Sequence, residues 1–316
     1  MFIISYIFLL GLSHIAANQT CTPAFISIKN QSIEIYEENY KNYTKRSDLG
    51  SPEPLLHQNL SVQAFLETTP CGVSARDPDQ MIIAGGPAPE KLFPWQVGLV
   101  SPRGLCGGVL ISSSWALTAA HCPVGENTTG ILGSVLLHTR HPRKQIRRVK
   151  IAVRHENFSL KSLLNDVALV KFDSPVVLND YVRPICLPKK GDVFDGVNAC
   201  FISGWGRLSK SPGPKPPLQF GRTSVMPESI CFYTLRLYGR HLKKGELCSD
   251  LAGSFVGRGD SGGPLSCKVG GRYYAAGLAS YTIKPPRRDI TFLPEMFSKV
   301  SEFIDWILKT IEEHGL

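Results

Sequence analysis

The sequence predicts an all-β protein that ends in one α-helix, and three observations support this fold class. The 316 residues include 29 glycines and 23 prolines, which is typical of a chain with many turns. From residue 82 onward, short apolar runs alternate with Gly, Pro, Asn and Asp, as in a β-barrel or β-sandwich. Near the C-terminus the apolar residues recur at helical spacing instead. Because hydrophobic residues make up 43% and charged residues 19%, the composition excludes a disordered chain and a coiled coil.

The individual elements follow from these patterns. The expected strands are residues 95–100, 107–111, 115–120, 147–153, 167–172, 199–203, 273–281 and 296–300. The helix is expected from the apolar positions Val300, Phe303, Ile304, Ile307, Leu308 and Ile311. Ser301 precedes most of them and is a candidate N-cap.

The N-terminus predicts a signal peptide over residues 1–17. Residues 2–12 form one apolar block, which is too short to span a bilayer, and Ala16 and Ala17 follow it at a plausible cleavage position. The alternative is a buried first helix or strand. The last residues carry no hydrophobic tail, so we expect no membrane anchor.

Residues 18–81 form a polar segment with little core-forming periodicity, which we interpret as a loosely structured leader. It carries five basic and eight acidic residues, whereas the rest of the chain carries 30 basic and 18 acidic residues and a net charge of +12. Six Asn-x-Ser/Thr sites predict glycosylation, and four of them fall in or at the leader: Asn18, Asn30, Asn42, Asn59, Asn127 and Asn157. Together with nine cysteines, they indicate a secreted protein or one of a secretory-vesicle lumen.

Three short segments combine residue types that can carry out nucleophilic catalysis. They are Leu117-Thr-Ala-Ala-His-Cys122, Asn165-Asp-Val-Ala-Leu-Val170 and Gly259-Asp-Ser-Gly-Gly-Pro264. A serine hydroxyl needs a neighbouring base to become a nucleophile, and a histidine can take its proton and return it to a leaving group. A buried carboxylate fixes the histidine tautomer, and glycines let backbone N–H groups approach a substrate oxygen.

With Cys106-Gly-Gly and Ile202-Ser-Gly-Trp-Gly206, these motifs resemble those of the trypsin-like (chymotrypsin-fold) serine proteases over about residues 71–311. The resemblance implies two packed six-stranded antiparallel β-barrels with a C-terminal α-helix. It also implies a peptidase domain over residues 82–316.

The resemblance assigns roles to five residues. It implies His121 as general base, Asp166 as its orienting carboxylate and Ser261 as nucleophile. Gly259 and Ser261 would supply the oxyanion N–H groups, and Ser280 would hydrogen-bond the carboxylate of Asp166.

The disulfide pattern is likewise implied by the resemblance. The expected pairs are Cys71–Cys186, Cys106–Cys122, Cys200–Cys267 and Cys231–Cys248. Cys21 is left over, either as a free thiol or in an intermolecular bridge. One further family disulfide is missing, because Gly257 stands where its first cysteine is expected.

The activation segment departs from the family pattern. Cleavage would create a new N-terminus at Ile82 or Ile83, whose amine would pair with Asp260. Neither isoleucine follows a basic residue, and the nearest arginine is Arg76. A processing enzyme with an apolar preference and a permanent zymogen-like state are both compatible with this segment.

The expected specificity pocket departs as well. Its floor aligns with Phe255, followed by Val256, and its walls align with Thr282 and Glu295 in place of glycines. Three outcomes follow. Phe255 and Thr282 could fill the pocket, Glu295 could offer a negative charge to a basic side chain, or a remodelled loop could turn Glu295 toward solvent.

Basic residues are dense in residues 140–150, and others lie further along the chain: Arg240, Lys243, Lys244, Arg287 and Arg288. They suggest an acidic glycan or acidic substrate as partner, and a solvated basic face is the simpler interpretation. We expect no nucleic-acid partner, no cofactor and no metal site, because neither the acidic nor the histidine residues show ligand spacing.

The sequence therefore predicts a secreted, glycosylated serine endopeptidase that acts on protein or peptide substrates through an acyl-enzyme and has non-standard specificity. The alternative is a protease-like binding protein that is weakly active or inactive.

Overall fold

The structure is a computed structural model of the whole chain. It describes residues 61–76, 86–206, 216–250, 257, 259–283 and 294–316. All of them belong to one compact unit. Among these residues, no helix is long and apolar enough to cross a membrane.

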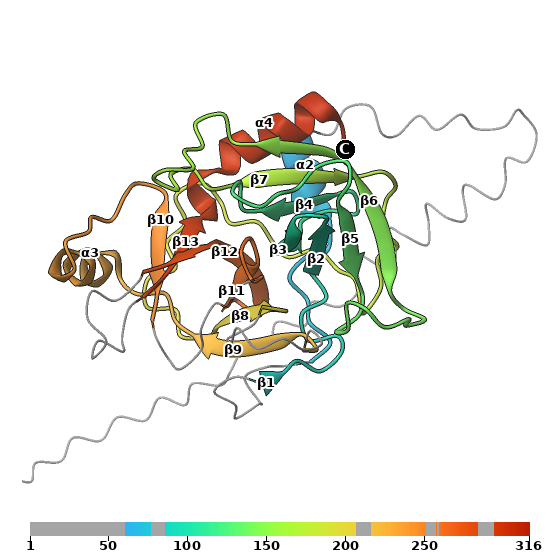
Figure 1. Cartoon of the computed structure of the whole chain (residues 1–316), viewed down its shortest axis with the longest axis horizontal. Helices are drawn as coiled ribbons and strands as arrows, with labels where there is room; N and C mark the ends of the chain where they lie inside the picture. Colours follow the sequence, from blue (N-terminus) through green and yellow to red (C-terminus); the bar gives the residue numbers. More distant parts are fainter. Residues whose placement is uncertain (1–60, 77–85, 207–215, 251–256, 258, 284–293) are drawn as a thin grey trace, which may run out of the picture. The chain divides into compact units, whose positions relative to one another are not determined.

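The N-terminal half of this unit is a closed six-stranded antiparallel barrel with the strand order β2-β3-β4-β7-β6-β5 (Figure 1). Its strands are β2 (Gln96–Ser101), β3 (Gly104–Leu110), β4 (Trp115–Thr118), β5 (Thr129–Leu132), β6 (Gln145–Arg154) and β7 (Ala168–Phe172). Strands β2, β3, β4 and β7 are largely buried, as expected of runs rich in Val, Leu and Ala. Strand β6 alternates between exposed and less exposed positions because its outer face is basic.

The C-terminal half contains a seven-stranded antiparallel sheet with the order β1-β9-β8-β11-β12-β13-β10. Its strands are β1 (Gly86–Pro87), β8 (Cys200–Gly204), β9 (Gln219–Thr223), β10 (Glu246–Ser249), β11 (Pro264–Val269), β12 (Arg272–Thr282) and β13 (Glu295–Lys299). An isolated bridge between Val225 and Ser249 brings the end of β9 toward β10. Because one bridge does not pair the two strands, the sheet of described strands stays open, and the second six-stranded barrel is not confirmed.

Three α-helices accompany the sheets in the described part of the chain: α2 (Val62–Thr68), α3 (Glu228–Leu237) and α4 (Ile304–His314). Helix α4 confirms the expected C-terminal helix and buries Ile304, Ile307 and Ile311. The prediction that Ser301 caps it was wrong. Ser301 lies in the 3-10 turn η2 (Val300–Glu302), where its hydroxyl donates to the carbonyl of Asp192, so the helix starts later.

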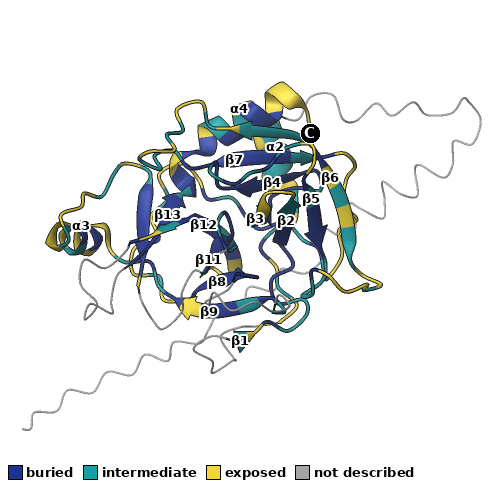
Figure 2. Ribbon diagram, in the orientation of Figure 1, coloured by how far each residue is buried: buried dark blue, intermediate teal, exposed yellow. Residues whose placement is uncertain are grey.

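Part of the predicted leader packs on the unit that carries the barrel. Helix α2 lies against α4, and its Val62 and Leu66 contact the main core (Figures 1 and 2). The N–H of Gly72 donates to the carbonyl of Pro184 at 2.9 Å, next to the disulfide between Cys71 and Cys186. Residues 61–76 are therefore a folded part of this unit, although they precede the predicted domain start at Ile82.

The four disulfides of the structure are the pairs that the resemblance implies: Cys71–Cys186, Cys106–Cys122, Cys200–Cys267 and Cys231–Cys248. Two of them cross-link neighbouring segments. Cys106–Cys122 joins β3 to the residue after His121, and Cys200–Cys267 joins the neighbouring strands β8 and β11. Cys21 lies outside the described residues.

Candidate active site

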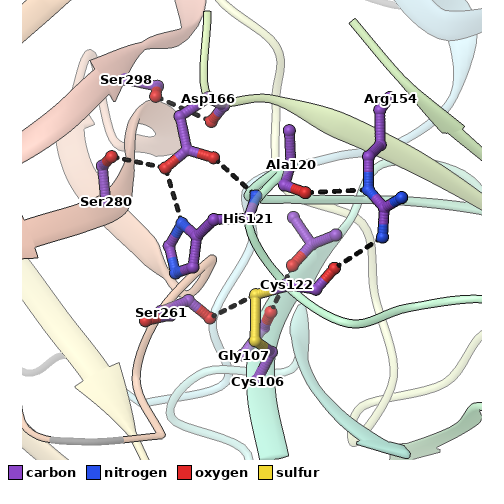
Figure 3. Close-up of polar contacts among 11 residues, drawn as sticks. Cys106, Gly107, Ala120, His121, Cys122, Arg154, Asp166, Ser261, Ser280 and Ser298 are labelled. Atoms are coloured by element: carbon purple, nitrogen blue, oxygen red, sulfur yellow. Dashed lines mark hydrogen bonds and ion pairs between the residues drawn. A yellow bond between two sulfur atoms is a disulfide. The ribbon is translucent and has the colours of Figure 1, made fainter. Parts of the chain in front are cut away.

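His121 and Asp166 meet beside the ends of β4 and β7. Asp166 is fully buried, and its Oδ2 lies 2.7 Å from Nδ1 of His121 (Figure 3). The backbone N–H of His121 donates to the other carboxylate oxygen, Oδ1, at 2.8 Å. Because a buried carboxylate can only accept, it holds the His121 proton on Nδ1 and leaves Nε2 free to accept. The two bonds fix both the backbone and the ring of His121.

Two serines complete the surroundings of Asp166. The hydroxyl of Ser280, near the end of β12, donates to Oδ2 at 2.5 Å. The hydroxyl of Ser298, in β13, donates to the backbone carbonyl of Asp166 at 2.8 Å. The carboxylate therefore accepts three hydrogen bonds, so both of its oxygens have partners although the side chain is buried. Ser280 was expected from the sequence, whereas Ser298 was not.

The turn that carries Ser261 packs against β3 and the end of β4. The carbonyl of Ser261 accepts from the N–H of Gly107 at 2.8 Å. A Cβ on Gly107 would lie 2.7 Å from Cα of Gly263, and one on Gly262 would lie 2.2 Å from Oγ1 of Thr118. These close approaches are why the segments around Ser261 and Cys106 require glycine. Figure 3 shows the His121 ring between Asp166 and Ser261.

The backbone around Ser261 limits which N–H groups can face a ligand. The N–H of Gly262 donates to the carbonyl of Ala279 at 2.7 Å, and that of Gly263 donates to the carbonyl of Asp260 at 2.8 Å. Neither is available to a substrate. Gly259 adopts a φ of 111°, a backbone conformation that favours glycine.

Arg154, at the end of β6, ties down the segment that contains His121. Its Nε donates to the carbonyl of Ala120 at 2.9 Å, and its Nη2 donates to the carbonyl of Cys122 at 3.2 Å. The guanidinium therefore bridges the residues on both sides of His121 (Figure 3). The sequence analysis did not single out Arg154, because no local pattern distinguishes it from the other basic residues of β6.

Asp260 is buried beside Ser261. Its carboxylate accepts from the N–H of Gly206 at 2.6 Å and from the N–H of Gly257 at 2.7 Å. Burial raises the pKa of the Asp260 carboxyl, and these two bonds oppose the rise. The folded state therefore binds the proton more tightly than the unfolded chain, whose pKa is about 4, and ionisation of Asp260 lowers stability as the pH rises above that value. A cation beside Asp260 would offset this cost.

With this geometry in place, the family can be assigned. The family model for trypsin matches residues 82–307. The chain belongs to the trypsin family. This membership supports a serine-peptidase class of hydrolase, and such proteins bind peptide substrates.

The structure describes only some of the residues that were predicted to form the specificity pocket and the activation site of this trypsin-family protein. Thr282 and Glu295 face each other across β12 and β13, with Thr282 exposed and Glu295 buried. The alternative in which Glu295 faces solvent is therefore wrong. Phe255, Val256, Ile82 and Ile83 lie outside the described residues.

The glycosylation sites that the structure describes are accessible. Asn127 and Asn157 are both exposed, so both can accept a glycan. Asn18, Asn30, Asn42 and Asn59 lie outside the described residues.

The basic segment of residues 140–150 is partly occupied by contacts within the protein. The ammonium of Lys144 donates to the carbonyls of Leu137 and Thr139, and Arg147 donates to the carbonyl of Pro175 at 3.1 Å. These contacts give glycan binding no support, and it stays a prediction. In the described parts of the chain, no group of three or more His, Cys, Asp or Glu side chains is arranged to hold a metal ion.

Replacing Gly204 by alanine is expected to destabilise the fold through Asp260. A Cβ at this position would lie 1.9 Å from Oδ1 of Asp260, which is buried and held by two backbone N–H groups. We expect Gly204→Ala to lower the free energy of unfolding by about 3 kcal/mol, from overpacking and a weakened charged hydrogen bond. Urea unfolding measures this loss.

The matched control is Gly125→Ala, because a Cβ at Gly125 would meet no atom within 4 Å. It should change the unfolding free energy by less than about 0.5 kcal/mol. Equal unfolding curves for the two variants would contradict the tight packing of Gly204 on Asp260.

Proposed function

We propose that the protein is a secreted serine endopeptidase in which Ser261, His121 and Asp166 form a catalytic triad. The observation that carries this proposal is the buried Asp166 carboxylate, which binds both the ring and the backbone N–H of His121. Burying a carboxylate is unfavourable unless it is hydrogen-bonded, and Asp166 also accepts from the hydroxyl of Ser280. In a trypsin-family protein, this arrangement is the one that serine-protease catalysis requires.

The proposed reaction proceeds in two stages. The Oγ of Ser261 attacks the substrate carbonyl while its proton passes to Nε2 of His121, and the N–H groups of Gly259 and Ser261 stabilise the oxyanion. His121 then gives the proton to the leaving amine, and the C–N bond breaks to leave an acyl ester on Ser261. A water molecule, deprotonated by His121, hydrolyses the ester and restores Ser261. Asp166 stabilises the imidazolium in both stages.

Activation is proposed to remove the bond before Ile82 or Ile83. The freed amine would supply the cation that the buried Asp260 favours, and Asp260 directly precedes Ser261 in the chain. The segment over residues 18–81 would then be a glycosylated propeptide that follows a signal peptide over residues 1–17. The resulting peptidase domain would extend from Ile82 to Leu316.

The specificity is proposed to differ from that of proteases with a carboxylate at the pocket floor. Phe255 and Val256 stand at that floor in the sequence, and neither can pair with a basic side chain. The buried Glu295, opposite Thr282, would place an acidic residue in one of the expected pocket walls.

The test is labelling of Ser261 by a fluorophosphonate, which reacts with activated serines. The precursor is given a specific protease site before Ile82, and in a second version before Ile83, and is labelled before and after cleavage. We expect the rate at which Ser261 is labelled to increase at least tenfold after cleavage in one of the two versions. This increase corresponds to an activation barrier that is lower by at least about 1.4 kcal/mol. Ser174→Ala, at an exposed serine, should label normally. Folded, cleaved protein without label on Ser261 would refute the proposed enzyme.

A further inference from the structure

Helix α3 is apolar on its outer face as well as on its inner face. It is anchored by Cys231, which forms a disulfide with Cys248, and by Leu235, both about 1% exposed. Ile230, Tyr233 and Leu237 are 53%, 67% and 82% exposed. Their spacing of three and four residues places them in one row on the side opposite to the anchors. We call Ile230, Tyr233 and Leu237 the α3 ridge.

The α3 ridge lies at the margin of the described unit. Helix α3 packs next to β10, which is the edge strand of the open sheet (Figure 1). Figure 2 shows exposed residues along its outer side. A surface helix normally presents polar residues there, and a row of three large apolar side chains on one short helix marks an interaction surface.

The ridge is supported by its own neighbours. Phe232 contacts Tyr233 edge to face with 5.5 Å between ring centroids, and the guanidinium of Arg236 lies 5.7 Å from the Phe232 ring. These contacts hold the exposed tyrosine on a rigid helical turn. A preorganised apolar surface loses little side-chain entropy when it binds.

Exposed basic side chains lie on α3 and in the residues that follow it. They are Arg236, Arg240 and Lys244, with His241 exposed among them. Lys243 is not counted, because its ammonium lies 3.7 Å from Glu246 and donates to the carbonyl of Ser162. The exposed acidic residue of α3, Glu228, stands at the N-terminal end of the helix, where it lines a pocket together with Lys244, whereas Arg236 and Arg240 stand at or beyond the C-terminal end. An apolar row flanked by cations is typical of helices that lie on anionic membranes.

We propose that the α3 ridge docks on the surface of an anionic phospholipid membrane. Ile230, Tyr233 and Leu237 enter the boundary between headgroups and acyl chains, where tyrosine is favoured because its ring is apolar and its hydroxyl polar. Arg236, Arg240 and Lys244 contact the lipid headgroups. The binding is peripheral and reversible, and it does not depend on whether Ser261 is catalytic.

A second copy of this chain fits the ridge less well. Ten helical residues span only about 15 Å, so one helix face buries far less than the roughly 1,000 Å² that a stable interface needs. Two apposed ridges would also bring two basic clusters together, which repel. A membrane surface satisfies both the apolar row and the positive charge.

The test is cosedimentation of the purified full chain with vesicles. The vesicles contain phosphatidylcholine alone or with about 30% phosphatidylserine, at about 0.1 M and about 0.5 M NaCl. We expect at least about fivefold more protein on the anionic vesicles at low salt, and a loss of this preference at high salt. The variant Ile230→Ser/Tyr233→Ser/Leu237→Ser should bind at least about fivefold less. The variant Arg236→Gln/Arg240→Gln/Lys244→Gln should lose the anionic preference.

The matched control is Leu160→Ser/Val193→Ser, which removes two exposed apolar side chains (72% and 63%) away from α3 and should bind like the parent. Urea unfolding confirms that each variant is folded. No binding of the parent to anionic vesicles, or binding that the ridge variant leaves unchanged, would overturn the proposal. So would a parent that sediments as a dimer without vesicles and becomes monomeric in the ridge variant, because the ridge would then be a self-interface.

Discussion

Asp166→Asn is expected to lower kcat/KM of the cleaved enzyme by about 10⁴-fold, the established scale for the orienting carboxylate of such a triad. The reason lies in the acceptors around His121. Each carboxylate oxygen of Asp166 accepts from His121: Oδ1 from the backbone N–H and Oδ2 from Nδ1. The hydroxyl of Ser280 also donates to Oδ2. An asparagine offers one oxygen and one NH₂ group. When the NH₂ group faces Nδ1, His121 must carry its proton on Nε2 and cannot accept from Ser261.

Steady-state kinetics on a peptide substrate measure this loss, and fluorophosphonate labelling of Ser261 should slow in parallel. The matched control is Asp173→Asn, which makes the same chemical change at an exposed position close to Asp166 in the chain. It should keep activity within about twofold, as a surface change away from the site. A loss below about tenfold in a folded Asp166→Asn variant would show that this carboxylate does not set the tautomer of His121.

The apolar strands of the first barrel follow from composition, whereas β5 of that barrel and β9 of the second sheet are harder to predict. Buried strands such as β4 and β7 are continuous apolar runs, so their position is evident from the sequence. Strand β5 contains Gly130, which lacks a side chain and so leaves space for the Phe172 ring. Because β5 is short and contains a glycine, its sequence does not look like that of a strand. Strand β9 includes Gln219 and Arg222, and its burial depends on its partners.

The candidate site also contains residues that the sequence identifies and residues that only the structure reveals. His121, Asp166 and Ser261 stand in short motifs of small and apolar residues, so the chemistry of the segments identifies them. Ser298 and Arg154 act through contacts made only after folding. Ser298 reaches the carbonyl of Asp166 across 132 residues of chain, and no local pattern distinguishes it from another strand serine. Helix α3 was missed because its apolar residues lie on two faces, which hides the period of a single buried face.

Removing the Cys71–Cys186 bridge is expected to destabilise the protein more than removing Cys231–Cys248. The first bridge joins residues 115 apart and the second joins residues 17 apart. Because a cross-link lowers the entropy of the unfolded chain more when it closes a longer loop, Cys71→Ser/Cys186→Ser should lower the free energy of unfolding by about 4–5 kcal/mol. Cys231→Ser/Cys248→Ser should lower it by about 3 kcal/mol.

The larger loss has a local cause too. The bridge holds residues 61–76 in place, where Val62 and Leu66 of α2 pack on the core and the N–H of Gly72 pairs with Pro184. Urea unfolding of the uncleaved chain compares the two double variants directly. After cleavage before Ile82 or Ile83, a non-reducing gel should show the leader still attached to the parent and released from Cys71→Ser/Cys186→Ser. Equal destabilisation by the two pairs, or release of the leader from the cleaved parent, would contradict a clamp at Cys71. Both expectations rest on the bridge from Cys71 to Cys186, which itself pairs with Tyr274 of β12.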